Sequence, residues 1–85
     1  MDFEEARSFM EKNHRGVVTT YQGNGAMHTS IVVCGAYQGH AAFVIVYGNS
    51  VKTHNLRRDT RCTLMAVDND WRSYVVVEGQ AQLLD

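Results

Sequence analysis

The residues best suited to chemistry lie between Tyr47 and Asn55, where an apolar segment gives way to hydroxyl, amide and lysine side chains. A helix is expected to begin there, capped by Asn49 or Ser50. Unpaired N–H groups at a helix start bind anions, and the helix dipole adds to this attraction. Lys52, in the first turn, opposes the dipole unless an anion is bound. The pattern predicts a phosphate at Lys52, with a solvated lysine beside an ordinary cap as the alternative.

A second group of polar side chains lies on the strand expected from Met27 to Tyr37. Alternation places His28, Ser30 and Val32 on one face of this strand. The same rule places Thr29, Ile31 and Val33 on the other face. Polar groups on a central strand face either water or a ligand, and the sequence leaves both readings open.

The sequence lacks the motifs of metal sites, hydrolases and nucleic-acid-binding proteins. The four histidines and two cysteines form no CxxC, HxxxH or HExxH pattern, so no metal site is expected. There is no GxSxG motif and no pair of carboxylates on one element. Arg57, Arg58 and Arg61 read as a solvated helix end, with Arg58 or Arg61 paired to Asp59. A net charge of −1 argues against binding to nucleic acid or a membrane surface.

The elements that must position these residues follow from periodicity and turn signals. Asp2 is expected to cap the first helix, with Glu5 completing a capping box. Gly79 is a candidate for a β-bulge in the last strand. Helices are predicted at 2–14 and 50–59, and strands at 17–21, 27–37, 41–47, 61–67 and 74–84, the third of them buried on both faces.

Five short strands in 85 residues predict one domain, a small antiparallel barrel with a first three-stranded meander. The last strand would be left with an unpaired edge, so a further C-terminal portion or a partner is expected to cover it. Two lone cysteines, an acidic start and the lack of a run of ~20 apolar residues predict a cytoplasmic protein with reduced thiols.

Three segments resemble the pyridoxamine-5'-phosphate-oxidase-like split β-barrel superfamily, and most closely its branch of deazaflavin (coenzyme F420)-dependent reductases. The resemblance covers nearly the whole chain, and its more specific part is the run from Lys52 to Arg61. It departs at Ser50, where the family often has arginine, and at Thr60, where it often has proline. The family's domain is also longer than this chain. The matching segments are 16–32 (the first hairpin), 52–61 (the second helix) and 71–83 (the last strand).

The resemblance implies a mainly β, FMN-binding split-barrel fold, and a homodimer with cofactor sites at its interface. It implies hydride transfer between reduced F420, or alternatively FMN, and a small organic substrate. No catalytic side chain is assigned; His28 and Tyr74 are only possible proton donors. A non-catalytic carrier or sensor of flavin, F420 or tetrapyrrole is the alternative. The implied cofactor-binding residues are Ser50, Lys52, Thr53 and Asn55 around the phosphate, and His28, Thr29, Ser30, Ile31 and Val32 along the ring.

Overall fold

Five strands and two short helices follow one another in the predicted order. The computed structural model describes residues 2–45 and 50–84. Its elements are α1 (Phe3–Lys12), β1 (Arg15–Tyr21), β2 (Met27–Tyr37), β3 (His40–Phe43), α2 (Val51–Arg58), β4 (Arg61–Val67) and β5 (Tyr74–Gln80).

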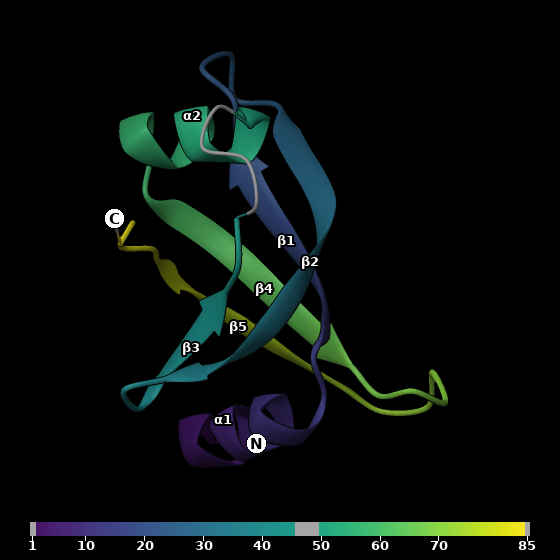
Figure 1. The fold of residues 1–85 in the computed structure, drawn as a ribbon. Helices are drawn as coiled ribbons and strands as arrows, with labels where there is room; N and C mark the ends of the chain where they lie inside the picture. Colours follow the sequence, from purple (N-terminus) through teal and green to yellow (C-terminus); the bar gives the residue numbers. More distant parts are fainter. Residues whose placement is uncertain (1, 46–49, 85) are drawn as a thin grey trace.

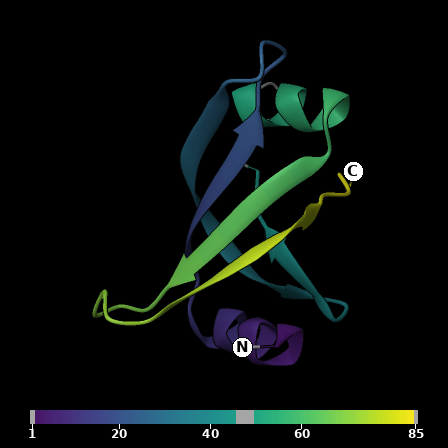
Figure 2. The same cartoon turned by 180° about the vertical axis from the view of Figure 1, so that it is seen from behind.

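The strands form one antiparallel sheet in the order β3-β2-β1-β4-β5, and this sheet curls into a half-barrel (Figure 1). The first three strands are the predicted meander. The view from behind shows α1 and α2 at opposite ends of the half-barrel (Figure 2). The prediction of a mainly β, split-barrel type of fold is confirmed, with β3 and β5 as the two edges of the sheet.

Side chains on the inner face of the curled sheet form the core. Alternation along β1 buries Val18 and Thr20 completely, while Thr19 between them is only half-buried. The amphipathic helix α1 covers one end of the core with Met10, which is also fully buried. The core cluster consists of Ala6, Met10, Val18, Val32, Cys34, Leu64, Ala66 and Val75.

The predicted strand at 41–47 is wrong in its extent and burial. β3 ends at Phe43, and Val44 is exposed. Because β3 is an edge strand that pairs only with β2, its side chains are half-buried at most. Residues 46 and 47 lie outside the described residues.

Four smaller expectations are also corrected. β5 ends at Gln80, because its partner β4 starts at Arg61, directly opposite. Gly79 pairs with Cys62 in an unbroken register, so it forms no bulge with β4. Asp2 caps α1 by accepting a hydrogen bond from the Glu5 backbone N–H. Among the described residues the Glu5 side chain makes no return bond to Asp2, so the predicted capping box is incomplete. The helix itself ends at Lys12, two residues before the predicted end.

Among the described glycines, Gly16 leaves the least room for a side chain. A Cβ atom there would lie 3.0 Å from Cys34 Sγ and 3.2 Å from the backbone oxygen of Met65. Gly16→Ala should therefore destabilise the protein by about 1–3 kcal/mol through overpacking. Gly79→Ala is the matched control, because nothing lies within 4 Å of its added Cβ. Urea unfolding of both variants checks this, and equal free energies of unfolding would contradict it.

Candidate functional site

Helix α2 lies across the end of the half-barrel where β1 ends and β2 begins (Figure 1). Ser50 is its cap, as predicted: the Oγ atom accepts a hydrogen bond from the Thr53 backbone N–H at 3.3 Å. The two hydroxyls also lie 3.0 Å apart. Asn49, the alternative cap, lies outside the described residues. The cap uses the Thr53 N–H, and the Val51 and Lys52 N–H groups have no acceptor among the described residues, so they are the ones that an anion could bind.

Lys52 lies on the side of α2 that packs against the barrel. Its neighbours three and four positions on, Asn55 and Leu56, are both buried, whereas Arg57 is exposed. Lys52 itself is half-buried. Within residues 2–45 and 50–84 it has no hydrogen-bond acceptor and no ion-pair partner. A half-buried cation beside a helix N-terminus is electrostatically unfavourable without an anion.

The Asn55 side chain is hydrogen-bonded at both ends to other protein groups. Its Nδ2 donates to Thr20 Oγ1 at 3.0 Å, and its Oδ1 accepts from Arg58 Nη2 at 3.1 Å. The same Arg58 nitrogen donates to the Tyr21 carbonyl at 2.9 Å. Asn55 is 3% exposed and Thr20 is fully buried. These bonds fasten α2 to the end of β1.

The two faces of β2 separate the residues predicted to line the ring. Val32 belongs to the hydrophobic core. His28 and Ser30 share its inward face, where His28 Nδ1 and Ser30 Oγ are buried and have no hydrogen-bond partner within 2–45 and 50–84. Thr29 and Ile31 lie on the outward face, and Ile31 is 86% exposed. The five predicted ring-lining side chains therefore lie on two opposite faces of β2 and do not form one surface.

The outer face of the sheet carries two adjacent rows of side chains that cross four strands. Strand pairing fixes each row, because opposite residues share a face. Thr19 and Thr29 Oγ1 atoms lie 3.1 Å apart within the polar row. The apolar row is Ile31, Val17, Met65 and Val76, and the polar row is Thr29, Thr19, Thr63 and Glu78. We call the two rows together the outer platform.

Arg61 lies next to the outer platform. Arg61 lies over the ring of Tyr21, 4.8 Å from its centroid, and forms the predicted ion pair with Asp59 at 2.7 Å. Hydrogen bonds from Arg61 hold the pKa of Asp59 at about 2. Arg58 makes the contacts with Asn55 and Tyr21 instead of pairing with Asp59.

Arg61→Ala should raise the pKa of Asp59 from about 2 towards its ordinary value of 3.8. Since the folded-state pKa is lowered, the ion pair stabilises the fold above pH 3.8 and loses that effect as the pH falls towards 2. NMR titration of the Asp59 carboxyl carbon measures both midpoints. An unchanged midpoint in the variant would contradict the assigned cause.

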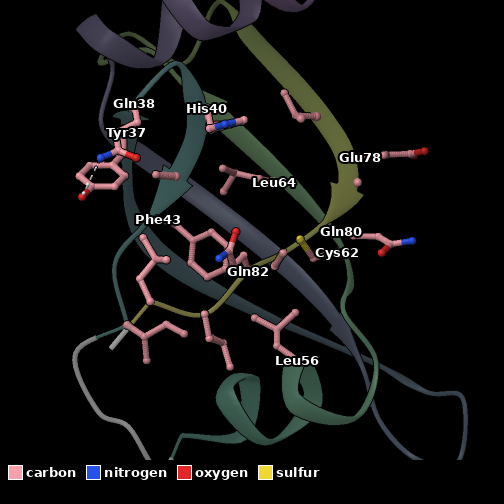
Figure 3. A pocket seen from close by; sticks show the side chains of 18 of the residues that line it. Tyr37, Gln38, His40, Phe43, Leu56, Cys62, Leu64, Glu78, Gln80 and Gln82 are labelled. Atoms are coloured by element: carbon pink, nitrogen blue, oxygen red, sulfur yellow. Dashed lines mark hydrogen bonds between the residues drawn. The ribbon is translucent and has the colours of Figure 1, made fainter.

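A cavity lies elsewhere, on the inner side of the half-barrel between β3 and β5. It has a volume of about 670 Å³, and Figure 3 shows Phe43, Leu56 and Leu64 pointing into it. None of the predicted cofactor-binding residues lines it. The two strands that flank it are the sheet edges, where the expected further strand would lie. That strand stays a prediction.

Other reactive groups are poorly placed for catalysis. Both cysteines are free, and burial raises the pKa of each thiol, so they stay protonated at neutral pH. The described residues contain no group of histidine, cysteine or acidic side chains that could hold a metal ion. No helix in the described part of the chain is long and apolar enough to cross a membrane.

The family model described as "Pyridoxamine 5'-phosphate oxidase" matches residues 3–85. The chain belongs to this family. The pyridoxamine 5'-phosphate oxidase family includes proteins that bind FMN or related cofactors. A search of curated proteins found no significant match.

Solved structures share the fold of this pyridoxamine 5'-phosphate oxidase family member. The conserved hypothetical protein Rv2991 from Mycobacterium tuberculosis is 26% identical, with a TM-score of 0.78 over 96% of this chain and 52% of its own. The Agrobacterium tumefaciens str. C58 protein Atu2129, of unknown function, is 16% identical, with a TM-score of 0.80. That match covers 100% of this chain and 41% of the other. The present chain thus spans about half the length of these relatives.

The roles of some residues around the site of this family member were not predicted from sequence. Thr20 and Arg58 hold Asn55, and Thr19 and Thr63 complete the polar row. Alternation within 17–21 indicates that Thr19 and Thr20 face opposite ways. It does not indicate which strand pairs with β1 or in what register, and that pairing creates the row.

Proposed function

We propose that this chain forms the cofactor-binding half of a flavin or deazaflavin oxidoreductase, with the cofactor phosphate at Lys52. The observation that carries the proposal is the half-buried Lys52 residue, whose ammonium has no counter-charge among the described residues. It lies in the first turn of α2, where the helix dipole and the free N–H groups also favour an anion. A ribityl phosphate would complete this arrangement.

The outer platform suits the ring of the cofactor. Its apolar row offers a flat surface for an aromatic face, and the neighbouring threonine hydroxyls offer hydrogen bonds at the ring edge. Of the residues predicted along the ring, Thr29 and Ile31 belong to this platform, while His28, Ser30 and Val32 face inward. We therefore assign ring contact to Thr29 and Ile31.

The same face supports the proposed homodimer. Ile31, Val33 and Val76 expose 86%, 61% and 48% of their surface, which is unusual for neighbouring apolar residues in a monomer. Two copies that pack through these faces would enclose a ring between them. Excluding water from the ring strengthens the electrostatic interactions of the site.

The bound cofactor would supply the hydride chemistry, and the protein would bind, orient and shield it. Resemblance of residues 52–61 and 71–83 favours F420 over FMN. The test mixes the protein with prereduced F420 or FMN and a panel of unsaturated or oxidised organic acceptors, without oxygen. Protein-dependent reoxidation of the cofactor is expected. Binding without turnover across the panel would favour the non-catalytic carrier instead.

A further inference from the structure

Asn55 was predicted to contact the cofactor phosphate, but its side chain is hydrogen-bonded to protein groups instead. Arg58 can only donate hydrogen bonds, so the Asn55 atom that faces its guanidinium must be the carbonyl oxygen. The amide nitrogen then faces Thr20 Oγ1, at 3.0 Å. Both ends of the amide are thus occupied, and only 3% of the residue is exposed.

We infer that Asn55 is a positioning residue, which acts on the cofactor only through the placement of α2. This inference rests on the proposed function for its ligand, although the anchoring itself does not. The chain of bonds runs from buried Thr20 through Asn55 to Arg58 and then to the Tyr21 carbonyl. It joins α2 to two consecutive residues at the end of β1.

The chain of bonds matters because α2 is short. The helix has eight residues, and besides Asn55 it buries only Thr53 and Leu56. Isolated helices of this length are unstable in water, so tertiary contacts must hold the helix. Lys52 lies one turn before Asn55 on the same side of the helix. A loosened Asn55 would therefore displace the Lys52 ammonium and the capped first turn together.

Thr20 makes the inference testable, since it is fully buried and cannot touch a ligand. Thr20→Val keeps the shape but removes the acceptor of the Asn55 bond, whereas Thr20→Ser keeps a hydroxyl. Amide hydrogen exchange of α2 should speed up about tenfold in Thr20→Val and stay within about threefold of wild type in Thr20→Ser. The affinity for F420 or FMN should fall about tenfold in Thr20→Val alone.

Asn55→Asp separates positioning from direct contact. An aspartate accepts from Arg58 and also from the Thr20 hydroxyl, so α2 should stay anchored. We expect wild-type exchange and an affinity within about tenfold of wild type, because the new carboxylate is paired with Arg58 but lies one turn from the phosphate. An aspartate in direct contact with the phosphate would instead weaken binding by about 100-fold or more while exchange stays unchanged.

Two results would overturn the inference. One is unchanged α2 exchange in Thr20→Val, which would show that the bond does not anchor the helix. The other is the large loss of affinity in Asn55→Asp with wild-type exchange, which would show direct contact. If the wild-type protein binds neither cofactor, the proposed function fails, and the exchange data still decide the anchoring. Asn55→Asp also keeps the experiment possible if Thr20→Val does not fold.

Discussion

Lys52→Ala should weaken the binding of F420 or FMN by about 5- to 150-fold, which corresponds to about 1–3 kcal/mol. The reason is the loss of a charge-assisted contact to the cofactor phosphate in a partly desolvated place. Isothermal titration calorimetry of the wild-type and variant proteins measures the difference. The effect should shrink at high salt, because part of it is a Coulomb interaction near the protein surface.

Arg57→Ala is the matched control for this prediction. Arg57 lies on the same helix and has the same charge, but it is exposed on the side away from the barrel. We expect its removal to change affinity little. Without cofactor, Lys52→Ala should leave stability unchanged or raise it slightly, because Lys52 opposes the helix dipole. Equal losses of affinity in the two variants would contradict a specific site at Lys52.

Ile31→Glu should break the proposed homodimer and abolish the cofactor binding proposed at its interface. Ile31 is 86% exposed in the single chain, so glutamate costs the monomer little. In the proposed dimer the carboxylate would be buried against the apolar row of the other copy. We expect the dimer dissociation constant to rise by about 100-fold or more, since an unpaired buried charge costs several kcal/mol.

Analytical ultracentrifugation over a range of protein concentrations measures this constant. Phe3→Glu is the control, because Phe3 is also an exposed apolar residue, at 46%, but lies on α1 and outside the outer face of the sheet. The control should remain dimeric. A wild-type protein that is monomeric and still binds cofactor would overturn the interface site, as would an Ile31→Glu protein that remains a dimer.

Much of the fold follows from local signals in the sequence. Alternation and β-branched residues predicted β2 with its observed ends, and Ser50 was identified as a helix cap. Errors occurred where a neighbouring strand decides the outcome. β5 ends where β4 no longer faces it, and β3 is half-buried because only β2 pairs with it. Such pairing is a long-range property that periodicity does not contain.

Around the proposed site, too, local features were predicted and long-range contacts were not. The position of Lys52 in the first turn of α2 follows from local sequence, and the structure has it there. Its lack of a counter-charge depends on the surroundings in three dimensions. The hydrogen bond from Asn55 to Thr20 joins residues 35 positions apart in the sequence. Alternation along β2 did predict the separation of His28 from Thr29, but not which face is outward.

The most direct test compares each cofactor with its counterpart that lacks the phosphate. Fluorescence titration of the wild-type protein would use FMN beside riboflavin, and F420 beside its phosphate-free deazaflavin nucleoside. A phosphate held by Lys52 and the first turn of α2 predicts that the phosphorylated member of at least one pair binds about tenfold or more tightly. Equal affinities within both pairs, or no binding by a folded dimer, would contradict the proposed site.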